Sequence, residues 1–219
     1  MRTELSGLSG TQRRSASTSG DRFCNLIAIL FMPQASSAYV FLGLSLANGI
    51  ERTFSYLLLA IFFASVVQLI SLYVYARRPG KDPNVQNRRE RPILFLGAVV
   101  SYFVGFVVLR LLGAPFIVNA LMFAYFVNIT MATVITEYVT KVSIHTWGIT
   151  GPALAILYSF GVLGFVLMLV LGALVGSTRV RLGSHTWGQV VLSFLVSIPL
   201  TWLVVYVLPV IFPAILETP

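Results

Sequence analysis

The residues best suited to chemistry in this chain are two histidines in near-identical surroundings. His145 lies in Ser143-Ile144-His145-Thr146-Trp147-Gly148, His185 lies in Ser184-His185-Thr186-Trp187-Gly188, and the chain has no other histidine. Each segment directly precedes an apolar run, so each imidazole is expected at the entrance of a helix. Helix N-termini attract anions, and an imidazole can act as a nucleophile or as a proton donor. The pattern indicates two groups that act together on one bound anion.

Basic side chains accompany the two histidines at the same end of the predicted helices. They are Lys81, Arg88 and Arg179, and Arg179 lies six residues before His185. Arginine holds phosphate oxygens through paired hydrogen bonds and stays charged, while lysine adds a point charge. No carboxylate pair and no cysteine cluster occur with them, since Cys24 is the only cysteine, which disfavours a metal site. We therefore expect a phosphate-binding site with no metal and no other cofactor.

Composition places these residues in a membrane protein. Of the 219 residues, 57% are apolar and 10% are charged, whereas about 25% of residues in soluble domains are charged. Several apolar runs reach the roughly 20 residues that a membrane-spanning helix needs, and none alternates as barrel strands do. We expect an all-α integral membrane protein, a polytopic bundle of about six to seven transmembrane helices. The net charge of +8 does not indicate nucleic-acid binding, because the basic residues cluster at helix ends.

The chain divides into a polar tail and one membrane-embedded domain. Residues 1–20 are rich in Ser, Thr, Gly and Arg and predict a disordered cytoplasmic tail. Residues 21–219 form the domain, whose clearest apolar runs are 23–47, 53–76, 93–112, 116–138 and 188–208. In the first run, Ala35-Ser36-Ser37-Ala38 also resembles a signal-peptide cleavage site, so removal of the preceding segment is an alternative.

The segment between His145 and Arg179 decides whether the two histidines meet. Its 33 residues could form one long helix, which would put the histidines on opposite sides of the membrane. As a hairpin broken at Gly161–Gly164, they would form two helices of about 16 residues, each about 24 Å long. The hairpin returns His185 to the side of His145, and it is the arrangement that we predict.

The hairpin also sets the expected orientation. Thirteen of the fifteen Lys and Arg residues then fall on the face that holds the tail and both histidines, and Arg52 and Arg110 fall on the other. The positive-inside rule places the richer face, with the N-terminus and the site, on the cytoplasmic side of the cell membrane. On this face Arg89 and Arg91 are expected to contact lipid head groups. Both Trp147 and Trp187 are expected to anchor helix ends at the membrane interface.

The ordered set of residues resembles the phosphatidic acid phosphatase type 2 superfamily, which includes lipid phosphate phosphatases and vanadium haloperoxidases. The family motifs are Lys-x6-Arg-Pro, Pro-Ser-Gly-His and Ser-Arg-x5-His-x3-Asp. This chain has Lys81-x6-Arg88-Arg89, Val142-Ser143-Ile144-His145 and Thr178-Arg179-x5-His185-x3-Gln189. The resemblance covers roughly residues 77–200 and contains the three motifs in the family order.

The resemblance implies a metal-independent hydrolase that removes phosphate from a lipid phosphomonoester or diphosphate, of polyprenyl or phosphatidic-acid type. It implies that His185 forms a phosphohistidine intermediate, that His145 is the general acid and that Gln189 orients the nucleophile. The implied phosphate ligands are Lys81, Arg88, Ser143 and Arg179. The expected partners are a lipid phosphate substrate and the bilayer.

Departures from the family motifs leave two other functions open. Gln189 stands where the family has an aspartate that would stabilise the positive form of the nucleophile, and Ile144 replaces a glycine with a freer backbone. A catalytically weak or inactive relative that binds anionic lipid head groups is one alternative. A small membrane transporter is the other, although the spans carry few charged residues to line a path.

Overall fold

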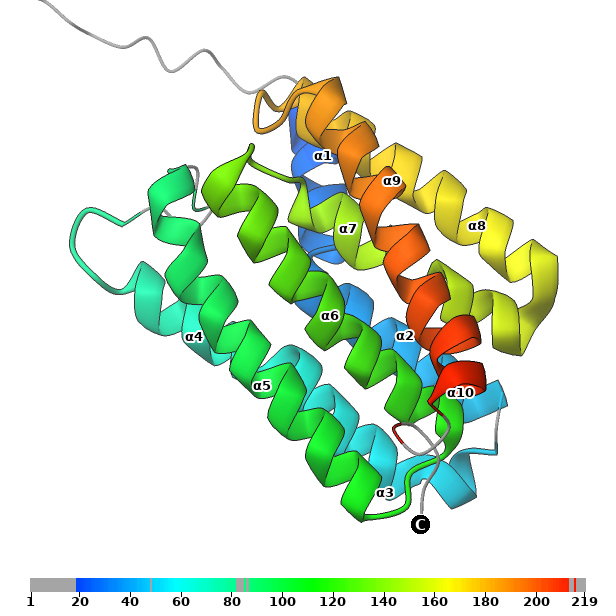
Figure 1. The fold of residues 1–219 in the computed structure, drawn as a ribbon. Helices are drawn as coiled ribbons and strands as arrows, with labels where there is room; N and C mark the ends of the chain where they lie inside the picture. The colour runs from blue at the N-terminus through cyan, green and yellow to red at the C-terminus, as the bar shows by residue number, and fades with distance from the viewer. Residues whose placement is uncertain (1–18, 48, 82–84, 86, 213–214, 216–219) are drawn as a thin grey trace, which may run out of the picture.

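The computed structural model describes residues 19–47, 49–81, 85, 87–212 and 215. The regular structure of these residues is entirely helical, as Figure 1 shows, which confirms the all-α class. The first helix begins at Ser19. The prediction of a disordered tail at residues 1–20 therefore lies almost wholly outside the described residues.

The helices follow one another with short connections. In order they are α1 (Ser19–Leu30), α2 (Pro33–Ala47), α3 (Ile50–Ile61), η1 (Phe62–Val66), α4 (Val67–Ala76), η2 (Arg88–Glu90), α5 (Arg91–Leu111), α6 (Phe116–Tyr138), α7 (Ile144–Thr150), α8 (Ala153–Arg181), α9 (Trp187–Trp202), η3 (Leu203–Val207) and α10 (Leu208–Ile211). Both η1 and η3 are π-helical turns inside longer helices, and η2 is a 3₁₀ turn that leads into α5. Pro92 lies in the first turn of α5, where its missing N–H has no intrahelical partner to lose.

Five helices are long and apolar enough to cross a membrane: Phe54–Ala76, Arg88–Leu111, Phe116–Tyr138, Ala153–Arg181 and Trp187–Ile211. The pair α1 and α2, bent by 53°, makes a sixth if it is one span. A helical membrane bundle is thus confirmed, with five or six helices of spanning length where six to seven were expected. The difference arises because the sequence counts two short arms between His145 and Arg179, whereas α8 contains the reversal between them.

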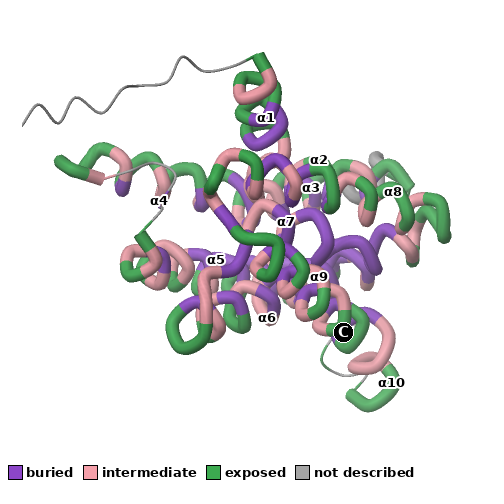
Figure 2. Tube along the Cα trace, turned by 90° about the horizontal axis from the view of Figure 1, so that it is seen from above, coloured by how far each residue is buried: buried purple, intermediate pink, exposed green. Residues whose placement is uncertain are grey.

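The outer faces of the bundle carry large apolar side chains. Examples are Ile93, Leu163 and Leu195, which are 65%, 83% and 67% exposed. Figure 2 shows that burial concentrates around α7 in the middle of the bundle, while α4 and the far end of α8 carry many exposed residues. Continuous exposed apolar surface of this extent suits contact with lipid chains.

The centre of the bundle is held by α6 and the helices packed against it. Aromatic pairs join α6 to α5, with ring centroids 4.7 Å apart for Phe106 and Phe123 and 5.6 Å apart for Tyr102 and Tyr125. Ring pairs at these separations stabilise a core beyond the area that they bury. The core therefore fixes the position of α6, on which α7 and α9 rest.

The reversal within α8 is located at Gly161. Its backbone angles, φ 69° and ψ −168°, are open essentially to glycine alone. Beyond this point three glycines pack on residues from before it: Gly164 on Ile156, Gly172 on Thr150 and Gly176 on Thr146. In these contacts the residue number increases along the second arm while that of its partner decreases. The chain therefore reverses direction at Gly161, as Figure 1 also shows. The predicted hairpin is confirmed, and the single long helix is wrong.

Two expectations for individual segments are corrected by packing. Trp147 is only 4% exposed and donates its indole N–H to Asn128 Oδ1 at 2.8 Å, so it is a core residue and no interface anchor. Trp187, in contrast, is 58% exposed. The segment that resembles a cleavage site lies inside α2, where the Ser37 hydroxyl is buried and donates to the Ala64 carbonyl at 3.1 Å.

Candidate active site

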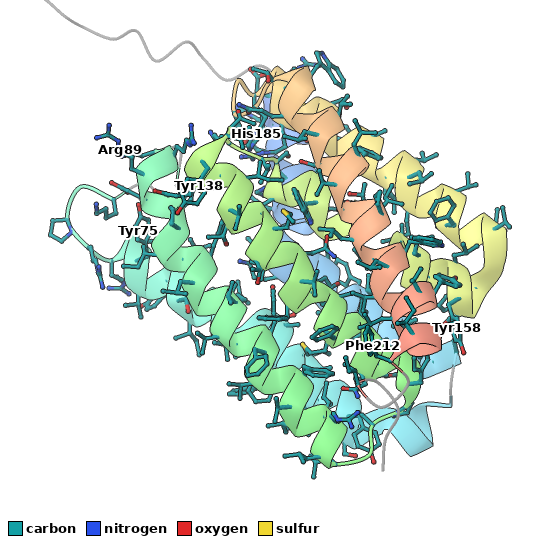
Figure 3. The ribbon with its side chains drawn as sticks, viewed as in Figure 1. Tyr75, Arg89, Tyr138, Tyr158, His185 and Phe212 are labelled. Carbon is teal, nitrogen blue, oxygen red and sulfur yellow. The ribbon has the colours of Figure 1, made fainter. Side chains whose placement is uncertain are left out.

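A cavity of about 180 Å³ lies among α2, α4, α5, α6, α7 and the end of α8. Its titratable and charged lining consists of His145, His185, Arg91 and Arg179. Figure 3 places His185 at the same end of the bundle as Arg89 and Tyr138, away from Tyr158 and Phe212. The hairpin therefore brings both imidazoles to one cavity near one end of the membrane bundle.

The spacing between Arg179 and His185 follows from how α8 ends. Gly183 adopts φ 65°, and the N–H groups of Ser184 and Gly183 donate to the carbonyls of Arg179 at 3.0 Å and Val180 at 2.9 Å. This pattern is the Schellman helix end. The His185 N–H also donates to the Arg179 carbonyl at 3.3 Å. The turn thus holds the imidazole beside the guanidinium of the last helical turn.

Gln189 determines which nitrogen of His185 carries the proton. Its Oε1 accepts from the Thr186 N–H at 3.3 Å, and Thr186 Oγ1 accepts from the Gln189 N–H, which is a capping box at the start of α9. Because an N–H group needs an oxygen acceptor, the amide orientation is fixed. The same Oε1 lies 2.9 Å from His185 Nδ1, so Nδ1 must donate. Nε2 then has its lone pair free, as a nucleophile requires.

His145 lies in the first turn of α7 and is held from α1. Its ring hydrogen-bonds the backbone of Ala28, near the bend between α1 and α2. Burial, followed by the nearby charge of Arg179 and the second imidazole, lowers the pKa of His145 to about 3. Burial likewise lowers the pKa of His185 to about 3, against the opposing hydrogen bond from Gln189. With pKa values this low, both imidazoles are neutral at physiological pH.

The two guanidiniums that line the cavity are buried. Arg179 is 5% exposed, and its Nε is buried with no hydrogen-bond partner among the described residues. Arg91 is 6% exposed and donates to the carbonyls of Val85 at 2.9 Å and Val142 at 3.1 Å. The like charges of the two arginines act unfavourably on each other. An anion between them would remove this repulsion and supply the missing partner of Nε.

Two of the predicted phosphate ligands, Lys81 and Arg88, do not line the cavity. The Arg88 guanidinium donates to the carbonyls of Thr136 and of Glu137, the latter at 2.7 Å, at the C-terminal end of α6. Free carbonyls at a helix end attract a cation. Lys81 forms an ion pair with Glu90 at 2.9 Å. The structure therefore places both side chains in contacts that hold the loop between α4 and α5, outside the cavity lining.

Arg91, which the sequence interpretation assigned to lipid head groups, takes the place that Arg88 was expected to fill. A signal was present, because the family motif ends in Arg-Pro and the Arg-Pro pair of this chain is Arg91-Pro92. The pair lies three residues beyond the family spacing from Lys81, so the spacing match at Arg88 was misleading. The buried position of Arg91 distinguishes the two arginines.

Ser143 is fully buried and does not line the cavity. Its hydroxyl lies 3.0 Å from Thr146 Oγ1, and its N–H donates to Ser193 Oγ at 3.1 Å. Ser193 in turn donates to the Gln189 carbonyl at 2.8 Å. Ser193, which belongs to no sequence motif described above, connects the segment before His145 to the first turn of α9 through these hydrogen bonds. Ser143 thus positions the site and does not face its contents.

Among the described residues, the rest of the cavity wall is uncharged. Gln34, Gln68 and Ser71 are its polar members, and the apolar members include Leu94, Phe95 and Tyr102 of α5. Within the described part of the chain, no group of three or more histidine, cysteine, aspartate or glutamate side chains could hold a metal ion. The donor set, two imidazoles and two guanidiniums, suits an oxyanion and not a cation.

Comparison of the chain with protein-family models, with curated proteins and with solved structures finds no match. The geometry and chemistry of the cavity are therefore the basis for a functional assignment.

Proposed function

We propose that this protein is an integral membrane phosphatase that hydrolyses a lipid phosphomonoester through a phosphohistidine on His185. The observation that carries the proposal is one cavity lined by two imidazoles and two buried guanidiniums, with no described residue hydrogen-bonded to Nε of Arg179. Two positive charges match the two negative charges of a phosphomonoester. A diphosphate carries more negative charge than the described lining would neutralise, so the monoester is the favoured substrate.

In the first half of the reaction, Nε2 of His185 attacks phosphorus and forms an N–P bond. The bond between phosphorus and the lipid oxygen breaks, and the leaving oxygen takes a proton from His145. Arg91 and Arg179 hold the other phosphoryl oxygens and stabilise the charge that develops on them. Gln189 keeps the proton on Nδ1 throughout, so the attacking nitrogen faces the cavity with its lone pair.

In the second half, water attacks phosphorus, the N–P bond breaks and inorganic phosphate leaves. His145, which is neutral after the first half, accepts the proton of the attacking water. Its protonation in the first half follows from binding, because the phosphate brings negative charge against the cations around it. Anion binding therefore raises the pKa of His145 above its value of about 3. Substrate binding should therefore be accompanied by proton uptake.

The sidedness of the site rests on the distribution of charge. The end of the bundle with His185 carries the basic loop between α4 and α5, and thirteen of the fifteen Lys and Arg residues belong to that face in the hairpin topology. By the positive-inside rule this face, with the N-terminus, lies in the cytoplasm of a cell that carries the protein in its cell membrane. The lipid chain would then remain among the apolar faces of the helices while its phosphate enters the cavity.

The test is phosphate release from a lipid phosphomonoester in mixed micelles by the wild-type protein and by His185→Ala. We expect release by wild type and at least a 10³-fold loss in the variant, because the covalent step is removed. Brief reaction with ³²P-labelled substrate should leave an acid-labile, base-stable label on wild type alone. Thr130→Ala, an exposed position on α6, is the control and should keep both signals. Equal release by His185→Ala would refute the mechanism.

A second candidate, a protein that binds anionic lipid heads without hydrolysing them, is favoured by one observation. The partner of His185 Nδ1 is the uncharged Gln189, so no carboxylate of a described residue stabilises the imidazolium character of a phosphohistidine. Binding of the lipid phosphate without release of phosphate would select this candidate over the phosphatase.

A further inference from the structure

Gln68 is a polar side chain within an apolar helix of membrane-spanning length, where burying a polar group is unfavourable. It lies in the second position of α4, within the apolar span Phe54–Ala76, and is 6% exposed. Polar groups inside a membrane span are costly and usually serve a site. Gln68 lines the same cavity as Arg179 and the two histidines. Its amide is therefore available to a molecule held by the phosphate-binding groups.

The orientation of this amide is set by the π turn before it. The carbonyl of Phe63 in η1 accepts from Gln68 Nε2 at 3.4 Å and from the Ser101 hydroxyl at 2.8 Å. A π turn leaves carbonyls without their usual helical partners, and these side chains satisfy one of them. With Nε2 directed to the carbonyl, Oε1 is directed away from it and has no hydrogen-bond partner among the described residues. Because Gln68 lines the cavity, this oxygen can accept a hydrogen bond from a donor on a molecule bound there.

The size of the cavity limits where that donor can be on the substrate. At about 180 Å³, the cavity is smaller than the roughly 300–1,000 Å³ of pockets that enclose whole drug-sized ligands. It has room for a phosphoryl group and the first carbons of its alcohol, while the lipid chain lies outside. The donor must therefore lie within a few bonds of phosphorus. A phosphate oxygen of the dianion cannot serve, because it carries no proton.

We propose that Gln68 accepts a hydrogen bond from a hydroxyl of the substrate, so that the site selects lipid phosphomonoesters with a free hydroxyl beside the phosphorylated carbon. This inference rests on the proposed phosphatase function and narrows its substrate class. Simple alkyl or isoprenyl phosphates, which lack such a hydroxyl, would leave Oε1 unpaired. Loss of one buried hydrogen bond corresponds to about a tenfold loss in kcat/KM.

Three matched substrates test the proposal with the full-length protein in mixed micelles. They are 1-oleoylglycerol 3-phosphate, its 2-deoxy analogue and its 2-O-methyl analogue, which share chain and phosphate and differ in the hydroxyl. We expect kcat/KM for the first to exceed that for each of the others by about tenfold. The 2-deoxy analogue removes the donor without adding bulk, and the methyl ether keeps the oxygen but replaces the donor with a methyl group. A loss shared by both analogues is therefore attributed to the missing hydrogen bond.

Gln68→Leu should lose about tenfold on the hydroxylated substrate and little on the other two. Ser101→Ala is the matched control, because it removes the other donor to the Phe63 carbonyl without changing the cavity wall, and it should keep the wild-type preference. Equal kcat/KM of wild type for all three lipids overturns the inference while the phosphatase function stands, and this comparison does not depend on a variant that folds. A preference that persists in Gln68→Leu also overturns it.

Failure of the phosphatase function is distinguished by a measurement that needs no turnover. The three lipids are compared by the increase that each causes in Tm of the wild-type protein. If no phosphate is released but the hydroxylated lipid gives the largest increase, the selectivity of Gln68 stands and the catalytic proposal falls. Equal increases without phosphate release overturn both.

Discussion

At the scale of single residues, one oxygen atom of Gln189 orients the proposed nucleophile, His185. It accepts hydrogen bonds from the Thr186 backbone and from His185 Nδ1 at once. A glutamine in this place fixes the tautomer and the ring orientation of the imidazole, as a carboxylate would, but brings no charge. Gln189 therefore orients the imidazole without supplying a negative charge. Substitutions at position 189 can measure what a charge adds to this orientation.

Gln189→Glu should keep both hydrogen bonds and add the charge. The carboxylate favours the protonated imidazole, so the pKa of His185, about 3 in the native protein, should rise by about 1–3 units. His185 attacks in its neutral form, and the acidic limb of the pH profile of kcat/KM should therefore move to higher pH by that amount. Ionisation of the substrate is common to both proteins and cancels in the comparison.

The control at the same position is Gln189→Leu, which removes the acceptor without adding charge. It should lower kcat/KM by about tenfold or more with no upward movement of the acidic limb, since the tautomer is no longer fixed. Superimposable pH profiles for Gln189→Glu and wild type would show that His185 does not act as the neutral nucleophile.

The two arginines near the start of α5 give a second residue-scale prediction. Arg91→Ala should lower kcat/KM by about 10²–10³-fold, because a buried donor to the phosphoryl oxygens is lost. Arg88→Ala should stay within a few-fold of wild type and instead lower Tm, because its guanidinium holds the carbonyls at the end of α6. Steady-state kinetics and thermal unfolding in detergent measure both. The reverse ranking in kcat/KM would restore Arg88 as the phosphate ligand.

At the scale of elements, the hairpin within α8 decides whether there is a site at all. The second arm of this hairpin approaches α9 and α7 closely where glycine leaves room: a Cβ on Gly176 would lie 2.5 Å from Val190 Cγ1 and 3.2 Å from Thr146 Oγ1. This contact lies one turn from Arg179 and next to the start of α7, so the packing of glycines sets the separation of the two histidine segments.

Gly161→Ala tests the reversal. The native angles of Gly161 are accessible essentially to glycine, and strain of this kind costs about 1–3 kcal/mol. No atom lies within 4 Å of the added Cβ, so backbone strain is the only expected effect. We expect a lower Tm and reduced phosphatase activity.

Gly43→Ala is the matched control, because the Cβ would meet only the Phe160 ring at 3.8 Å, an ordinary contact. Its effect on the free energy of unfolding should lie within about 0.5 kcal/mol. A Tm for Gly161→Ala equal to that of Gly43→Ala would mean that the reversal does not depend on the glycine backbone.

The sequence was sufficient for the features that depend on local periodicity and composition. Apolar runs predicted the helical membrane bundle, and the glycines near 161–164 predicted the reversal, because only glycine adopts such angles without strain. The roles of Arg88 and Arg91 could not be separated in this way, since both lie in a basic loop three residues apart. The two arginines differ in their tertiary contacts. Arg88 lies beside the end of α6, whereas Arg91 is covered by the segments whose Val85 and Val142 carbonyls accept its hydrogen bonds.

The misassigned Trp147 has the same physical origin. Two similar Thr-Trp-Gly segments predicted similar environments, but α7 packs into the bundle and buries its tryptophan against Asn128, while the start of α9 leaves Trp187 exposed. The local sequence determines where each helix begins, whereas packing against neighbouring helices determines whether its first turn is buried.

At the scale of the whole molecule, the ends of the bundle are chemically distinct. Arg89 belongs to the end that holds the cavity, and Phe212 lies at the far end, as Figure 3 shows. Both side chains are exposed, and Cys24 is buried. Single cysteines at these two positions can therefore report sidedness in a Cys24→Ala background.

An impermeant maleimide should label Phe212→Cys on intact cells and Arg89→Cys only after the cells are permeabilised. We expect this result because the positive-inside rule favours the proposed orientation, with the basic end in the cytoplasm. Cys24→Ala without an added cysteine should remain unlabelled in both conditions and serves as the control. Labelling of Arg89→Cys from outside would place the phosphate-binding end on the external surface.

The segment near the bend between α1 and α2 connects His145, the proposed proton donor, to α1. Ala28 is hydrogen-bonded to His145 and stands nine residues, roughly 14 Å of helix, from Ser19. A force applied at Ser19, by a tether or a bound partner, would thus be transmitted along α1 to the imidazole of His145, the proposed proton donor. Turnover in this molecule should respond to mechanical load on its amino-terminal helix, while the same load on α10, at the other end, should leave it unaffected.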